Sequence, residues 1–173
     1  MPRLIVTFAK SRHTDGVVVL DGGVAYISRS RTIAAQPQAI WDVLADFGSL
    51  SSWADNVDHS AISNRGPDGG PLGTTRRVQL GRTTLLERIT AFDPPSSLAY
   101  DITGLPKRLR SIANRWALRP SRPTATEVTL TSTVEIGSGP LARLAERVVA
   151  RAMAKQSDAL LAALAHRSET THG

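Results

Sequence analysis

Seven segments of the chain are rich in β-branched residues or alternate hydrophobic and polar residues with the two-residue period of β-strands. They are residues 26–35, 57–64, 74–80, 83–92, 97–104, 111–120 and 125–136. Sequences rich in Pro, Gly, Asp and Ser separate most of them and predict turns. Because the last six segments follow one another without an intervening helical pattern, they predict an antiparallel meander rather than alternating β and α units.

Between the first two of these segments, the hydrophobic residues follow a helical period instead. Pro37 suits the first turn of a helix. The residues expected to face a core are Ile40, Val43, Leu44 and Phe47. Gly48 breaks this helix, and residues 49–55 predict a short second helical turn or a loop. Trp41 lies beside the hydrophobic stripe and is expected to pack in the core between helix and sheet.

A longer helix is predicted from Leu141 to His166, with Pro140 suited to its first position. No helix breaker interrupts it, and at ~1.5 Å per residue it is about 39 Å long. The stripe expected to face the core comprises Leu141, Leu144, Val148, Ala152, Leu160 and Leu164. Residues 168–173 are expected to form a frayed tail.

The first 25 residues admit two interpretations. Two β-prone runs within residues 16–27 flank Asp21-Gly22-Gly23, which is a hairpin signal. Residues 1–25 therefore form either an added strand pair or a disordered extension. Residues 26–167 are expected to form one domain, because a 173-residue chain with 41% hydrophobic and 21% charged residues suits a single globular core.

Composition and charge argue against several classes of protein. No hydrophobic run approaches the roughly 18 residues of a membrane-spanning helix, so no membrane insertion is expected. The N-terminus lacks the pattern of a signal peptide, and a cytoplasmic location is expected. The net charge is +6, but the arginines are scattered, with the densest cluster in residues 107–115, and no nucleic-acid partner is predicted.

The sequence holds no recognisable motif for catalysis or for a cofactor. It has no cysteine and no Gly-x-Ser-x-Gly sequence, and its four histidines lack the spacing of metal ligands. The Gly-rich residues 66–73 lack the Lys-Ser/Thr pair of a phosphate-binding loop. No catalytic residue, cofactor or metal site is therefore predicted.

The order of elements is a strand, a helix pair, about six strands and a long terminal helix. Four segments resemble the START-like (SRPBCC) superfamily, in its polyketide cyclase/dehydrase and lipid-transport branch: residues 27–55, 87–102, 114–136 and 139–164. The resemblance covers roughly residues 25–166. Residues 1–25 and the turn at residues 120–124 depart from the family's usual pattern.

The resemblance implies an α+β helix-grip fold. In that fold a curved antiparallel sheet of about six or seven strands wraps around a long C-terminal helix, with two short helices after the first strand. It also implies a cavity between sheet and helix that binds a hydrophobic or amphipathic small molecule.

The two-residue period predicts which strand residues face this cavity. In residues 111–120, Asn114 and Trp116 alternate with Arg115 and Arg119, so the face without arginine is taken as the inner one. The same reasoning pairs Tyr100 with Leu98 and Ile102, and Arg76 with Val78 and Leu80. Ser132 also falls on the inner face. Glu87 stays ambiguous, and either Glu87 or Asp101 could pair with an inward Arg76.

The candidate ligand-binding residues are Trp53, Arg76, Tyr100, Asn114 and Trp116. Apolar walls with a few polar groups suit a small-molecule site. For Tyr100 and Trp116, plain core packing is an equally open interpretation. Trp53 follows the helix break at Gly48, where the resemblance implies a short helix at the cavity entrance, and it is predicted to be a rim residue.

Three functions remain open. The first is binding of a hydrophobic or amphipathic molecule, such as a lipid or a polyketide-like compound. The second is an enzyme of the polyketide cyclase/dehydrase type, in which Arg76 or Tyr100 polarises a carbonyl. The third is a protein-interaction module, such as a chaperone co-factor, a quinone-binding accessory protein or a ribosome-associated toxin, all of which occur in the superfamily.

Overall fold

The computed structural model describes residues 16–20, 24–105, 109–136 and 142–170 of the chain. Within these residues, eight strands form one sheet in the order β1-β2-β8-β7-β6-β5-β4-β3, and every neighbouring pair is antiparallel. The strands are β1 (Gly16–Leu20), β2 (Val24–Ile33), β3 (His59–Asn64), β4 (Thr75–Leu80), β5 (Thr83–Asp93), β6 (Ser97–Thr103), β7 (Leu109–Arg122) and β8 (Ala125–Ile136).

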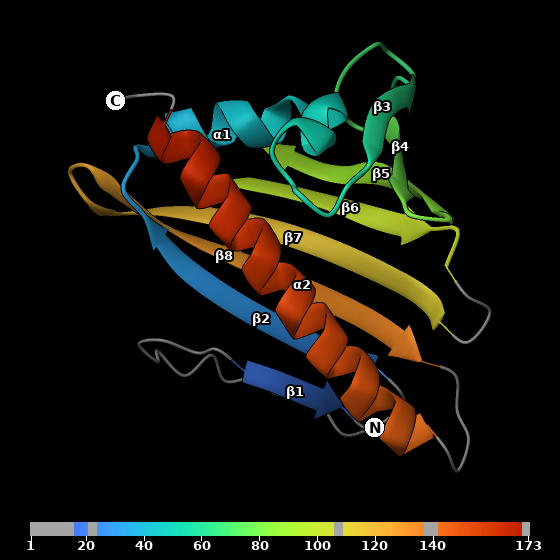
Figure 1. Ribbon diagram of the computed structural model, residues 1–173. Coiled ribbons are helices and arrows are strands. Elements are labelled where there is room, and N and C mark those ends of the chain that lie inside the picture. The colour runs from blue at the N-terminus through green and yellow to red at the C-terminus, as the bar shows by residue number, and fades with distance from the viewer. Residues whose placement is uncertain (1–15, 21–23, 106–108, 137–141, 171–173) are drawn as a thin grey trace, which may run out of the picture.

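Three helices complete the described fold: α1 (Pro37–Ala45), the 3-10 helix η1 (Phe47–Ser52) and α2 (Ala142–Thr170). Figure 1 shows the sheet curving around α2, while α1 and η1 lie across one end of the sheet. Strands β2 to β8, the two short helices and α2 form the α+β helix-grip fold that was expected. None of the helices in the described residues is long and apolar enough to cross a membrane.

Strand β1 adds an eighth strand at the edge of the sheet. It pairs with β2 from Gly16 opposite Ser28 to Leu20 opposite Val24. Of the two interpretations of residues 1–25, a strand pair therefore describes residues 16–20. Residues 1–15 and the expected turn at residues 21–23 lie outside the described part of the chain.

Helix α2 packs on the sheet only partly along the predicted stripe. Leu160 and Leu164 of that stripe are buried, whereas Val148 is 62% exposed and Ala152 is also exposed. The buried side chains are Ala150, Ser157, Leu160, Leu161, Leu164, Ala165 and Ser168. Ser157 is a small polar residue on the buried face of the helix, and a stripe chosen by hydrophobicity does not include it. Leu141 lies outside the described residues, as does the side chain of Leu144.

The prediction of a frayed tail at residues 168–173 is wrong for residues 168–170, because α2 continues through Thr170. Ser168 is completely buried. The Glu169 carboxylate accepts a hydrogen bond from the Ala34 amide at 2.9 Å, which ties the last turn of α2 to the end of β2. Residues 171–173 lie outside the described chain.

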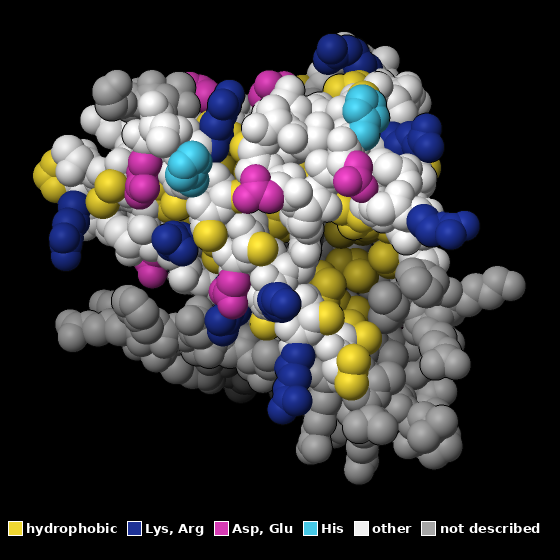
Figure 2. Space-filling view, in the orientation of Figure 1, with side chains coloured by type: hydrophobic (Ala, Val, Ile, Leu, Met, Phe, Trp, Pro, Cys, Tyr) yellow, Lys and Arg dark blue, Asp and Glu magenta, His cyan; other side chains and the backbone are white. Residues whose placement is uncertain are grey.

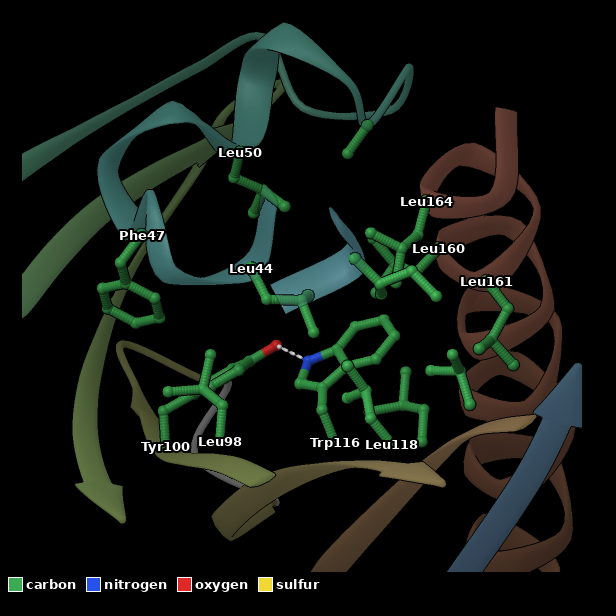
Figure 3. Close-up of a cluster of buried hydrophobic side chains, with 14 of the residues drawn as sticks. Leu44, Phe47, Leu50, Leu98, Tyr100, Trp116, Leu118, Leu160, Leu161 and Leu164 are labelled. Atoms are coloured by element: carbon green, nitrogen blue, oxygen red, sulfur yellow. Dashed lines mark hydrogen bonds between the residues drawn. The ribbon is translucent and has the colours of Figure 1, made fainter. Parts of the chain in front are cut away.

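The core fills the space between the sheet, the short helices and mainly the C-terminal half of α2. Figure 3 shows Leu44, Phe47 and Leu50 from the short helices meeting Leu98, Tyr100, Trp116 and Leu118 from the sheet. Leu160, Leu161 and Leu164 approach this cluster from α2. As expected, Trp41 is a packing residue: it is buried, and its ring meets the ring of Phe92 edge-on at a centroid distance of 4.9 Å.

Leu164→Ala is expected to lower the free energy of unfolding by about 2–5 kcal/mol, because it leaves a cavity under α2. Leu164 is fully buried, whereas Leu72 is 54% exposed. Leu72→Ala is therefore the matched control, with an expected change within about 0.5 kcal/mol. Urea unfolding measures both values, and equal effects of the two substitutions would contradict this packing.

Candidate functional site

A cavity of about 330 Å³ lies between the sheet and α2. Its walls come from η1 and the residues after it, from β4 to β7, and from α2. Most of the lining is apolar: Leu50, Val57, Val78, Leu80, Leu85, Ile102, Leu105, Ile112, Ala152, Met153 and Leu160. The polar lining residues are Glu87, Tyr100, Asn114 and Gln156. Figure 2 shows apolar side chains in a recess beside α2 on this face of the molecule.

Glu87, which lines the cavity, forms an ion pair with Arg76, which does not line it. Strands β4 and β5 place the two residues directly opposite each other. The Arg76 Nε donates a hydrogen bond to Glu87 Oε2 at 2.6 Å, and both side chains are buried, with exposures of 5% and 7%. A charge in such a place is stable only when it is paired, so the pair explains why both residues tolerate burial.

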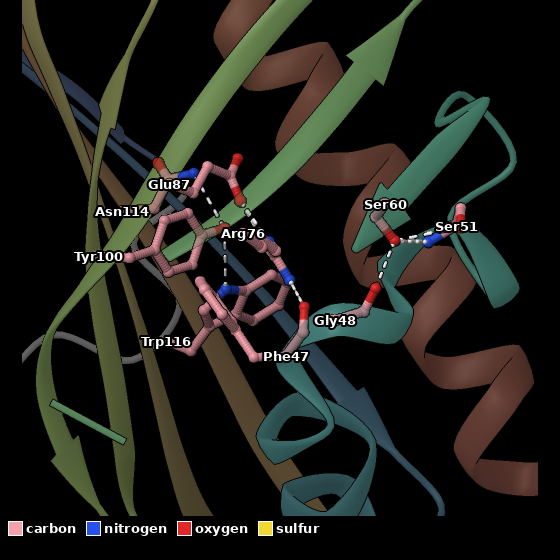
Figure 4. A network of polar contacts seen from close by, with 9 residues as sticks. All are labelled: Phe47, Gly48, Ser51, Ser60, Arg76, Glu87, Tyr100, Asn114 and Trp116. Atoms are coloured by element: carbon pink, nitrogen blue, oxygen red, sulfur yellow. Dashed lines mark hydrogen bonds and ion pairs between the residues drawn. The ribbon is translucent and has the colours of Figure 1, made fainter. Parts of the chain in front are cut away.

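Arg76 is also held by Phe47. Its Nη1 donates to the Phe47 carbonyl oxygen at 2.8 Å, and its guanidinium carbon lies 3.9 Å from the centroid of the Phe47 ring. The guanidinium carbon lies 5.2 Å from the centroid of the Tyr100 ring (Figure 4). The guanidinium is thus enclosed by the sheet, by η1 and by two aromatic rings.

Glu87, rather than Asp101, is the partner of Arg76. Asp101 is exposed. Both contacts from Arg76 reach the same carboxylate oxygen, Oε2. Among the described residues, Glu87 Oε1 has no hydrogen-bond partner, and Glu87 is one of the residues that line the cavity. Of the two residues of the ion pair, Glu87 and not Arg76 lines the cavity, and Oε1 is the carboxylate oxygen that Arg76 does not contact.

A second cluster of hydrogen-bonded polar residues spans three neighbouring strands. The register places Tyr100 on β6 opposite Asn114 on β7, and Asn114 opposite Ser132 on β8. The Tyr100 hydroxyl oxygen accepts hydrogen bonds from Asn114 Nδ2 at 3.3 Å and from Trp116 Nε1 at 3.4 Å. Asn114 Oδ1 in turn accepts from the Ser132 hydroxyl at 2.7 Å. These bonds leave the Tyr100 proton without an acceptor among the described residues.

Burial raises the pKa of Tyr100 above its ordinary value of 10.0. The negative charge of Glu87 adds to this increase, while Arg76 and the hydrogen bonds from Trp116 and Asn114 oppose it. The Tyr100 side chain is therefore a neutral phenol at physiological pH. It can donate its proton to a hydrogen bond but does not carry a negative charge.

Of the five residues predicted to bind a ligand, Tyr100 and Asn114 line the cavity. Trp116 is 2% exposed and lies behind Tyr100, to which it donates a hydrogen bond. Arg76 points inward, as its strand register predicts, but does not line the cavity. The two-residue strand period did not predict whether Glu87 points inward, because both faces of its strand carry leucine and charged residues.

The prediction for Trp53 needs correction, because Trp53 does not line the cavity between sheet and helix. It caps η1 and lines a separate pocket of about 220 Å³, together with Val43 of α1 and Arg167 of α2. Leu50 is the η1 residue that faces the main cavity. The turn of the 3-10 helix thus directs Leu50 and Trp53 to different sides, which the linear sequence does not reveal.

The unfolding free energy is expected to fall as the pH rises above 10, and Tyr100→Phe is expected to weaken this fall. Because the folded pKa of Tyr100 lies above the unfolded value of 10.0, the folded state holds the proton more tightly. This contribution is fully present below pH 10 and is lost as the pH rises from 10 through the folded pKa. Urea unfolding between pH 9 and 11 measures it, and identical pH profiles for the two proteins would contradict the assignment.

Arg76→Met is expected to destabilise the protein by about 3–5 kcal/mol, because it leaves Glu87 buried without its counter-charge. Glu87→Leu leaves Arg76 unpaired in the same way. The double variant Arg76→Met/Glu87→Leu removes both charges and is expected to be more stable than the sum of the single effects predicts. A double-mutant cycle by urea unfolding tests the pair, and strictly additive effects would show that the two side chains are not coupled.

Comparisons with known proteins agree with this architecture. The Zhui aromatase/cyclase from Streptomyces sp. R1128 superposes with a TM-score of 0.71 at 18% identity, covering 84% of this chain and 94% of that one. A START superfamily protein from Mycobacterium smegmatis gives a TM-score of 0.67 at 16% identity, covering 84% and 98%. At these identities the likeness shows the fold alone.

The di-domain aromatase/cyclase StfQ from the steffimycin biosynthetic pathway gives a TM-score of 0.73 at 16% identity, covering 87% of this chain and 52% of that one. No functionally curated protein sequence matches the chain. Residues 25–169 match the family described as polyketide cyclase/dehydrase and lipid transport. This range contains β2 apart from its first residue, all of β3 to β8, and α2 apart from its last residue. The chain therefore belongs to the family described as polyketide cyclase/dehydrase and lipid transport.

Proposed function

We propose that the protein binds a hydrophobic or amphipathic small molecule in the cavity between the sheet and α2. The main support for this proposal is an apolar cavity lined by two polar side chains, each of which can form one more hydrogen bond. Glu87 Oε1 lacks a donor and the Tyr100 hydroxyl proton lacks an acceptor among the described residues. A bound molecule that accepts from Tyr100 and donates to Glu87 would gain hydrogen bonds that fix its orientation.

The size and lining of the cavity support the same function. A volume of about 330 Å³ falls within the range of small-molecule sites, which are mostly apolar with a few placed polar groups. Burial of a ligand's apolar surface contributes roughly 25 cal/mol per Å². The apolar walls would therefore supply most of the affinity, and the polar groups would orient the ligand.

A cyclase or dehydrase activity is the second candidate, because Glu87 and Tyr100 line the same cavity. In such a reaction the neutral Tyr100 phenol would donate a hydrogen bond to a substrate carbonyl, and Glu87 would accept a proton from an adjacent carbon. Arg76 is not assigned the carbonyl-polarising role considered from sequence, because Glu87 and the Phe47 carbonyl already engage its guanidinium. Two of the structurally similar proteins are described as aromatase/cyclases, which also supports this candidate.

Leu85→Trp is expected to weaken ligand uptake by at least about tenfold, because the larger side chain would fill part of the cavity. Leu86→Trp is the matched control. The two leucines are neighbours on β5, but Leu85 lines the cavity, whereas Leu86 does not line it and is 42% exposed. Fluorescence titration with the neutral dye N-phenyl-1-naphthylamine measures the dissociation constant of each variant.

Native mass spectrometry of the gently purified protein provides an independent measurement. A small-molecule adduct in the wild type and in Leu86→Trp, but not in Leu85→Trp, would support the proposal. If the wild-type protein neither carries an adduct nor takes up the dye, the cavity is not a binding site. Equal dye binding by the two tryptophan variants would place the dye elsewhere on the molecule.

A further inference from the structure

The described residues that line the cavity include a negatively charged side chain but no positively charged one. Among the described lining residues, Glu87 is the charged side chain, and none is Lys, Arg or His. Arg76 supplies a positive charge nearby, but its Nε and Nη2 contact Glu87 Oε2 and its Nη1 contacts the Phe47 carbonyl. A ligand in the cavity therefore meets a carboxylate oxygen rather than a cation.

Glu87 Oε1 and the Tyr100 hydroxyl proton would pair with different kinds of ligand group. Glu87 Oε1 requires a hydrogen-bond donor, whereas the Tyr100 hydroxyl proton requires an acceptor. The register places Glu87 opposite Ile102 and two residues along β6 from Tyr100, so the pair is diagonal on one face of the sheet. Side chains at such positions lie close enough to contact the same group, since the diagonal spacing is roughly 7–8 Å. Figure 4 shows both side chains near the Arg76 guanidinium.

Simple functional groups differ in how they meet these demands. A carboxylate accepts hydrogen bonds but cannot donate one, and it would bring a second negative charge beside Glu87 at low dielectric. An ammonium group donates but cannot accept, and a ketone accepts but cannot donate. A hydroxyl group donates one hydrogen bond and accepts others, so one hydroxyl can pair with both Glu87 and Tyr100.

We infer that the cavity selects uncharged hydrophobic molecules bearing a hydroxyl group and discriminates against the corresponding carboxylates. This inference rests on the proposed ligand-binding function and names the ligand class of the same cavity. Glu87 and Tyr100 are its specificity-determining residues. Arg76 and Trp116 are positioning residues, which hold the carboxylate and the phenol where they line the cavity.

Four compounds with one ring system test the inference: 2-naphthol, 2-naphthoate, 2-naphthylmethylammonium and 2-methylnaphthalene. Their dissociation constants are measured at pH 7 by equilibrium dialysis with the full-length protein. We expect 2-naphthol to bind at least about tenfold more tightly than 2-methylnaphthalene, and 2-naphthoate at least about tenfold more weakly than 2-naphthol. The ammonium compound is expected to bind more weakly than 2-naphthol, because it leaves Tyr100 without an acceptor.

Two substitutions test whether Tyr100 and Glu87 cause this selectivity. Tyr100→Phe keeps the ring and removes the donor, so it is expected to reduce the preference for 2-naphthol over 2-methylnaphthalene. Glu87→Gln removes the negative charge, so it is expected to narrow the gap between 2-naphthol and 2-naphthoate. Because Glu87→Gln also leaves Arg76 without a counter-charge, circular dichroism checks its fold, and Tyr100→Phe carries the test if that variant is unfolded.

The results separate this inference from the proposed function. If 2-naphthoate binds as tightly as 2-naphthol, the inference is overturned while ligand binding stands. An unchanged preference for 2-naphthol over 2-methylnaphthalene in Tyr100→Phe also overturns it. If none of the four compounds binds, or if Leu85→Trp binds them as well as the wild type does, the proposed function and the inference fail together.

Discussion

The buried ion pair between Arg76 and Glu87 connects the parts of the molecule that surround the cavity. It joins β4 to β5, and through the Phe47 carbonyl it joins both strands to η1. The short helices that close one end of the sheet are therefore attached by a charged group and not only by apolar packing. Removal of one charge leaves the other buried, so the pair constrains which residues can surround it.

The same pair determines the chemistry of the cavity surface. The Arg76 guanidinium contacts Glu87 and the Phe47 carbonyl and does not line the cavity, whereas Glu87 lines it and has one carboxylate oxygen that Arg76 does not contact. Burial raises the pKa of Tyr100 further above its ordinary value, and hydrogen bonds from Asn114 and Trp116 orient the phenol. A hydrogen-bond acceptor and a hydrogen-bond donor thus line one apolar space. This arrangement supports binding of an amphipathic molecule more directly than catalysis by a cation.

Close packing of α2 on the sheet limits the cavity to one part of the interface. Near Leu161 and Leu164 the helix is buried against the sheet and the short helices. Nearer its middle, Ala152 and Met153 line the open space instead. The ion pair between Arg29 and Asp158, with a hydrogen bond of 2.8 Å, fastens the exposed side of the helix to β2.

The sequence by itself determined strands β2 to β8, helices α1 and α2, and the inward positions of Tyr100, Asn114 and Trp116, because strand and helix periods are local and leave their pattern in the residue types. Only the tertiary structure decided that Glu87 pairs with Arg76, since that choice depends on the register between β4 and β5. It also decided the rotation of α2 about its axis and the separation of Trp53 from the cavity. These features depend on contacts between residues distant in the chain, where side-chain size and partner matter more than hydrophobicity.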